Sequence, residues 1–313
     1  MKTSNSRPSV RSRLVRSLIV RPYLRKVFDL EKTAIEQMRQ NFVKIGKRNI
    51  LPRGTVVERT TAAGLPAEWV IAANVPKDSG GVILHFHGGG IVGSCDTHRY
   101  LASLISKASG VRVLVVEYRL APEHKYPAAN DDCLAAYRWL IENCFSPESI
   151  IIGGDSFGAG LALMTLLSLR DAGDTLPAAA YLFSPWDFIR FDGESYKSRA
   201  KIDPLANKKS YQICADSYIG SSASKPVSLF DRNMAGLPDL LIQTGDHEVV
   251  LSDSVRIAEN TRKAGMNVAL DVWNGMWHGF QGFAAVVPEA SQALDNVGRF
   301  VKDHLACPRH IKQ

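Results

Sequence analysis

The sequence predicts an α/β protein with a mainly parallel sheet and helices on both faces. From residue 82 onward, apolar runs of strand length alternate with longer segments that favour helices. Hydrophobic residues make up 45% of the 313-residue chain and charged residues 22%, as in ordinary soluble proteins. No apolar run reaches the ~18 residues that a membrane span needs.

Eight segments are predicted to be strands. The first two, 55–61 and 68–73, flank the turn Gly64-Leu65-Pro66. The other six are 82–86, 111–118, 149–153, 178–183, 240–243 and 268–273. In a sheet of this kind the ligand site lies beyond the carboxyl ends of the strands, so loops distant in sequence meet there.

Helices are expected between these strands, at 96–109, 128–143, 157–171, 252–264 and 288–304. Residues 1–50 also favour helices, although Pro22 should break or start one. We therefore divide the chain into an N-terminal helical segment, 1–50, and an α/β domain, 51–313. Within that domain, 188–236 is expected to be an insertion over the sheet edge, with one helix near 208–218.

A candidate nucleophile lies between a predicted strand and a predicted helix, in Gly154-Asp155-Ser156-Phe157-Gly158. This G-x-S-x-G pattern is typical of a sharp turn that exposes the serine. The alternative is a glycine-rich phosphate loop, but neither the G-x-G-x-x-G nor the G-x-x-x-x-G-K-[ST] pattern occurs in this stretch.

A nucleophilic serine needs a histidine base. Of the histidines after Ser156, His278 follows the last predicted strand directly, where the base is expected. His304 lies on the last helix, His310 in the tail, and His247 beside the candidate acids.

The acid that orients the base should follow the strand 240–243. Glu248, Asp246 and Asp253 compete for this role. We favour Glu248, because Asp246 is nearer the strand end and Asp253 is expected to open the next helix.

Backbone donors for an oxyanion are predicted in His87-Gly88-Gly89-Gly90, directly after a strand. We expect the amides of Gly88, Gly89 and Phe157 to form the oxyanion hole. The pair His85 and His87 could suggest a metal, but no acidic or cysteine partner stands at an obvious spacing. We therefore expect neither a metal nor a cofactor.

The net charge of +7 is concentrated at the N-terminus, where residues 1–30 hold eight Lys/Arg and one acid. A charge this local argues against a nucleic-acid-binding protein. Arg16 and Arg21 interrupt the apolar residues, so a signal peptide is not expected. We favour a basic amphipathic lid helix over a helix that touches a membrane surface. The five cysteines form no C-x-x-C pattern, which favours reduced thiols in a cytoplasmic protein.

These motifs resemble the hormone-sensitive-lipase-like (family IV) group of bacterial carboxylesterases. The resemblance spans about residues 80–282 and rests on His87 to Gly90, Tyr118 to Glu123 with Tyr126 to Ala129, Gly154 to Gly158, Ser184 to Trp186 and Gly275 to Phe280. It implies an α/β-hydrolase fold in which residues 1–50 and the insertion 188–236 form a helical cap over the catalytic domain 51–313. It also implies hydrolysis of short- to medium-chain esters through an acyl-enzyme. A lactone hydrolase or an amidase would use the same triad. The oligomeric state stays open between monomer and homodimer.

Two departures from the family pattern bear on the site. Members usually carry Ala after the nucleophile and Gly-Gly beyond it, whereas this chain has Phe157 and then Gly158-Ala159. The Phe157 amide can still act, but its ring should narrow or reshape the pocket. Many members use Asp as the acid, and a similar branch carries Glu at the place of Glu248.

Overall fold

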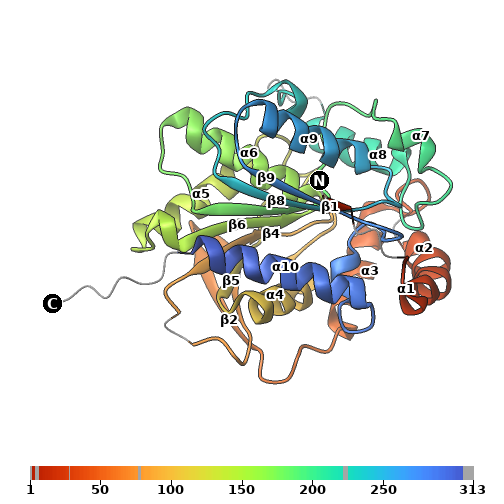
Figure 1. Cartoon of the computed structure of the whole chain (residues 1–313), viewed down its shortest axis with the longest axis horizontal. Helices are drawn as coiled ribbons and strands as arrows, with labels where there is room; N and C mark the ends of the chain where they lie inside the picture. Colours follow the sequence, from red (N-terminus) through yellow and green to blue (C-terminus); the bar gives the residue numbers. More distant parts are fainter. Residues whose placement is uncertain (1, 4–6, 28, 77–78, 221–224, 306–313) are drawn as a thin grey trace.

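The computed structural model describes residues 2–3, 7–27, 29–76, 79–220 and 225–305. Its centre is one sheet with the strand order β1-β9-β8-β7-β6-β4-β5-β3-β2 (Figure 1). Pairing is antiparallel in β2–β3 and β3–β5 and parallel elsewhere. The strands are β1 (Lys2–Thr3), β2 (Val56–Ala62), β3 (Leu65–Ile71), β4 (Val82–Phe86), β5 (Arg112–Val116), β6 (Ile150–Asp155), β7 (Ala179–Phe183), β8 (Asp239–Gly245) and β9 (Val268–Trp273).

The eight predicted strands correspond to β2–β9, so the mainly parallel sheet is confirmed; the two-residue β1 is an addition at the edge beside β9. The second strand begins at Leu65, three residues earlier than predicted. The reason is a tight hairpin, in which Ala63 (φ 53°) and Gly64 (φ 80°) form the turn and Ala62 pairs with Leu65.

Helices cover both faces of the sheet (Figure 1). One face carries α4 (Cys95–Ser109) and α10 (Pro288–His304), which pack closely: a Cβ on Gly298 would lie 2.3 Å from the Ala108 carbonyl oxygen. The other face carries α5 (Ala128–Glu142), α6 (Phe157–Ala172) and α9 (Leu251–Lys263). Each face has its own buried apolar cluster, as a sheet buried on both sides requires.

The N-terminal segment is helical, as predicted. It contains α1 (Val10–Val15), the π-helix η1 (Arg16–Leu24), α2 (Arg25–Val27) and α3 (Ile35–Arg48). The prediction for Pro22 is wrong, because the helix continues through it. In η1 the hydrogen bonds run five residues back, and this wider turn accommodates a residue that has no N–H.

The insertion 188–236 contains α7 (Ser195–Ser198), α8 (Lys208–Ile219) and η3 (Leu229–Asp231), with residues 221–224 outside the described part. Two further 3₁₀ turns are η2 (Pro147–Ser149) and η4 (Phe280–Phe283). Across the described residues, no helix is both long and apolar enough to cross a membrane.

Candidate active site

Ser156 occupies a sharp turn between β6 and α6. Its backbone has φ 55° and ψ −117°, and its N–H donates to the Phe183 carbonyl at 2.8 Å. The two glycines of the motif, Gly154 and Gly158, lie where no side chain would fit. A Cβ on Gly154 would lie 2.4 Å from the Gly158 carbonyl oxygen, and one on Gly158 would lie 2.0 Å from that of Phe86. The turn therefore has the strained geometry expected of a nucleophile elbow.

His278 and Glu248 form a direct hydrogen bond, although they are 30 residues apart. Nδ1 of His278 lies 2.8 Å from Oε2 of Glu248. Because a carboxylate can only accept, Nδ1 carries the proton and Nε2 is left as the basic nitrogen. Glu248 is fully buried, and its Oε1 accepts from the Gly245 amide at 2.5 Å and the Ser184 hydroxyl at 2.9 Å.

The pKa of His278 is raised above 6.5. Burial alone would lower it, but the charge and hydrogen bond of Glu248 favour the protonated imidazole more strongly. This is the electrostatic arrangement that a base needs if it is to hold a proton during a reaction.

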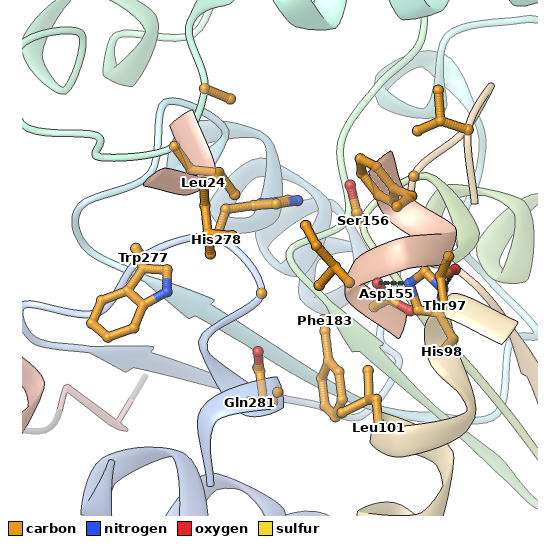
Figure 2. Close-up of a pocket in the computed structure, with 18 of the residues that line it drawn as sticks. Leu24, Thr97, His98, Leu101, Asp155, Ser156, Phe183, Trp277, His278 and Gln281 are labelled. Carbon is orange, nitrogen blue, oxygen red and sulfur yellow. Dashed lines mark hydrogen bonds and ion pairs between the residues drawn. The ribbon is translucent and has the colours of Figure 1, made fainter. Parts of the chain in front are cut away.

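Ser156 and His278 face the same cavity, which has a volume of about 670 Å³ (Figure 2). Its wall is mainly apolar and comes from η1, α3 and α8, for example Leu24, Met38 and Cys214. Tyr211 of α8 stands edge-on to the His278 ring, with the ring centroids 5.7 Å apart. The cavity thus joins the candidate nucleophile and the candidate base to an apolar chamber.

The competing acids and histidines have other partners. Asp246 accepts from the Gly275 amide at 2.5 Å, and Asp253 accepts from Tyr196 and from the Asp187 amide. His247 contacts Arg16 and His304 pairs with Asp239, whereas His310 lies outside the described residues.

The predicted oxyanion donor Gly88 needs a correction. Its N–H already donates to Oδ1 of Asp155 at 3.0 Å, and it is absent from the cavity wall. Gly89 (φ 85°) and Gly90 (φ 53°) do line the cavity, together with Ser156 and Phe157. The sequence motif indicates the loop, but which amides turn toward the cavity depends on the backbone conformation after β4.

The residue before Ser156, Asp155, makes contacts that we did not predict. It lies between two histidines, 3.1 Å from Nε2 of His85 and 3.3 Å from Nε2 of His98. Burial would raise its pKa, but the two histidines hold it well below the usual range. Asp155 also binds the Gly88 amide, so it links the elbow to the glycine loop. The sequence signal for these contacts was the position of Asp155 directly before the serine of the motif. No sequence pattern indicated His98.

The two histidines considered as metal ligands, His85 and His87, form hydrogen bonds with other groups of the protein. His85 contacts the Tyr181 hydroxyl at 2.9 Å as well as Asp155. His87 contacts the Gly88 carbonyl at 2.9 Å and stacks on Tyr118, with centroids 4.2 Å apart. Burial lowers the pKa of His87 to about 3, so it is neutral.

The Phe157 ring packs against the insertion rather than standing free in the cavity. It is 2% exposed, and its centroid lies 4.6 Å from that of Phe188 and 4.9 Å from that of Tyr218 on α8. The ring still contributes to the cavity wall. It therefore shapes the pocket as part of a buried aromatic cluster that connects α6 to α8.

A family model described as alpha/beta hydrolase fold matches residues 83–282. The chain belongs to this α/β-hydrolase family. The match contains the glycine loop, the elbow, Glu248 and His278.

Relatives and solved structures place the chain more closely within the α/β hydrolases. An acetyl-hydrolase of Streptomyces hygroscopicus is 35% identical over 92% of this chain and 95% of its own length. An esterase of Acinetobacter venetianus is 37% identical over 70% of this chain and 74% of its own. A crystal structure of an esterase from the bacterial hormone-sensitive lipase family superposes with a TM-score of 0.88 and 35% identity, covering 96% of this chain and all of the other. The resemblance to the hormone-sensitive-lipase-like group is thereby confirmed.

Proposed function

We propose that this α/β hydrolase is a serine carboxylesterase with Ser156 as nucleophile, His278 as base and Glu248 as the orienting acid. The observation that carries the proposal is the 2.8 Å bond between His278 Nδ1 and the buried Glu248, at a cavity that also contains the strained Ser156. Relatives named esterase and acetyl-hydrolase support the same reaction class.

We assign the oxyanion hole to the amides of Gly89, Gly90 and Phe157. All three residues line the cavity beside Ser156, and the Phe157 amide opens α6, where an N–H has no acceptor within the helix. Such donors act where negative charge develops on the carbonyl oxygen, and one of them is worth about 2.7 to 4 kcal/mol in the transition state.

The reaction consists of two acyl transfers. Ser156 attacks the ester carbonyl while Nε2 of His278 takes the hydroxyl proton, and the imidazolium is stabilised by Glu248. His278 then gives the proton to the leaving alcohol. Water repeats the sequence on the acyl-enzyme, with His278 again as the base. Side chains and backbone amides of this chain perform each step.

We propose that residues 1–50 and the insertion 188–236 together form the cap. Both contribute to the cavity wall, through Met38 and Phe42 of α3 and through Tyr211 and Cys214 of α8. An apolar chamber of about 670 Å³ suits esters of short to medium acyl chains.

A series of chromogenic esters of increasing acyl length, with a lactone and an aryl amide beside it, tests this function. Wild-type protein should hydrolyse the shorter esters fastest. Ser156→Ala should abolish turnover while circular dichroism and melting temperature stay unchanged. Retained turnover would remove Ser156 from the mechanism, and faster hydrolysis of the lactone or the amide would change the substrate class.

We also infer a cytoplasmic location. Cys95, Cys133, Cys144 and Cys214, the cysteines in the described residues, are free thiols, as expected in a reducing compartment. Activity that stays with the cells after osmotic shock would support this location, and release with the periplasmic fraction would contradict it.

A further inference from the structure

The N-terminal helical segment, residues 7–27, is fixed against the catalytic loops. Val20 is fully buried in a cluster that includes Trp277. Nη1 of Arg16 lies 2.6 Å from Nδ1 of His247 and donates to the Gly275 carbonyl at 3.2 Å. Ser9 donates to Glu289 through its amide and its hydroxyl. The outward face of this segment therefore has a defined orientation relative to the active site.

That outward face is an apolar stripe. Val10, Leu14, Leu18 and Tyr23 are 61%, 52%, 68% and 69% exposed. Their spacing of four, four and five residues follows one face, first along α1 and then along the wider turn of η1. A single exposed apolar side chain needs no explanation, but a row of four marks an interaction surface.

The same segment is strongly basic. Its exposed cations are Arg7, Arg11, Arg13, Arg21 and Lys26, and residues 7–27 include no acid. Basic side chains beside an exposed apolar stripe are the composition of helices that lie in the interface of anionic bilayers. A protein partner for this surface would have to be apolar and acidic at once, whereas an anionic bilayer has both properties.

The stripe also borders the opening of the active-site cavity. Ile19 and Leu24 of η1 line the cavity, as do Ile50 and Val286. Ile19, Ile50 and Val286 are 46%, 89% and 49% exposed, so the cavity reaches solvent next to this segment. A bilayer in contact with the stripe would face the opening.

We propose that the stripe Val10, Leu14, Leu18 and Tyr23, with the surrounding cations, docks the protein on an anionic lipid surface beside the cavity opening. The apolar side chains enter the boundary of the acyl region and the cations bind the headgroups. An acyl chain can then pass from the lipid into the cavity without crossing water. This docking is independent of the proposed catalysis, because none of the docking residues lines the cavity.

Co-sedimentation of the full-length protein with lipid vesicles tests the proposal. At low salt the protein should bind vesicles of phosphatidylcholine mixed with phosphatidylglycerol, and it should not bind vesicles of phosphatidylcholine alone. Binding should fall as salt shortens the range of the charge attraction. In R11Q/R13Q/R21Q each removed charge should lower the partition coefficient about fivefold.

The apolar stripe is tested by L14S/L18S/Y23S. This variant should lose most binding and keep wild-type turnover of a small soluble ester, which shows that it is folded. Val227→Ser is the matched control, because Val227 is 55% exposed but lies in the insertion, and it should bind as wild type does. Absent binding to the anionic vesicles at low salt overturns the proposal, as does unchanged binding by both multiple variants. A third result would also overturn the proposal: wild-type protein is a dimer in light scattering, and L14S/L18S/Y23S is a monomer with unchanged vesicle binding. The stripe would then join two copies of this chain.

Discussion

Three features of single residues are combined at Ser156. Its φ is positive, the glycines two residues before and after it have no room for a Cβ, and its amide donates to the Phe183 carbonyl. Each alone is common in turns. Together they fix Ser156 between the end of β6 and the start of α6, so its position is set by backbone crowding rather than by a side-chain contact.

The role of Glu248 can be tested through the pH dependence of the reaction. In the proposed mechanism ester hydrolysis needs neutral His278, so kcat/KM should fall as pH drops through a pKa above 6.5. Glu248→Gln removes the charge that raises this pKa, so the acid limb should move to lower pH. Its kcat/KM at neutral pH should also fall by roughly 10³ to 10⁴.

Asp246→Asn is the matched control for Glu248→Gln, because Asp246 is on the same loop but bonds the Gly275 amide. It should keep most activity and an unshifted acid limb. A larger loss in Asp246→Asn than in Glu248→Gln would transfer the acid role to Asp246.

We propose that Asp155 is a positioning residue, because it accepts a hydrogen bond from the Gly88 amide, next to the proposed oxyanion donors Gly89 and Gly90. Asp155→Asn removes the charge that the two histidines face. We expect kcat to fall by about 10² to 10³, the cost typical of a lost oxyanion donor, with KM nearly unchanged. The affinity of a boronic acid that mimics the tetrahedral intermediate should fall by a similar factor.

A purely structural role for Asp155 would give a different pattern. The melting temperature would drop while kcat and boronate affinity per folded molecule stayed at the wild-type level. Asp239→Asn is the control, since Asp239 begins β8 at the far end of the sheet and pairs with His304. It should leave both kinetic readouts unchanged.

Single residues were predictable from sequence where the chemistry repeats a local pattern. Ser156 is marked by its glycines, and His278 and Glu248 by their place after the last two strands. Gly88 was chosen over Gly90 because the motif gives no information on where each amide points. Asp155 and His98 are 57 residues apart, so their pairing exists only in the folded chain.

At the scale of elements, the contact between α6 and α8 depends on Phe157. Phe157→Ala should leave a cavity beside Phe188 and Tyr218 and lower the free energy of unfolding by about 3 to 5 kcal/mol in urea denaturation. The enlarged pocket should also shift the ester series toward longer acyl chains.

Phe145→Ala separates these two effects. Phe145 stacks on Trp69, away from the cavity, so its loss should cost stability without changing the acyl-chain profile. An unchanged profile in Phe157→Ala would show that the ring contributes to packing alone.

Element boundaries were predictable to within about three residues where apolar runs end at Gly, Pro or charged residues, as in β4 and β9. The π-helix around Pro22 could not be predicted from sequence, because its conformation depends on burial of Val20 against the loop that contains Trp277. The start of β3 was misplaced by three residues because Ala63 and Gly64, both with positive φ, form the turn in place of Gly64-Leu65-Pro66.

At the scale of the whole molecule, the buried carboxyl group of Asp253 should make the free energy of unfolding depend on pH. Asp253 is buried, accepts from the Tyr196 hydroxyl at 2.8 Å, and its burial raises its pKa to about 7. An acid with a pKa raised by folding favours the folded state at low pH. That contribution is lost as pH rises from about 4, the unfolded pKa, to about 7.

The free energy of unfolding of Asp253→Asn, relative to wild type, should therefore rise by roughly 1 to 3 kcal/mol between pH 5 and pH 8. Urea denaturation at the two pH values measures it. Asp171→Asn, at an exposed acid, is the control and should show no such pH dependence. An equal effect of Asp253→Asn at both pH values would mean that Asp253 stays charged throughout.

The contact of Arg16 with both His247 and Gly275 has a consequence for recombining relatives of this protein. The N-terminal segment is not an exchangeable module, because one side chain joins it to the loop before Glu248 and the loop before His278. A chimera that receives a foreign N-terminus without the matching loops would keep its fold but lose turnover. Transfer of the segment together with residues 245–250 and 274–279 should preserve the contact between Glu248 and His278.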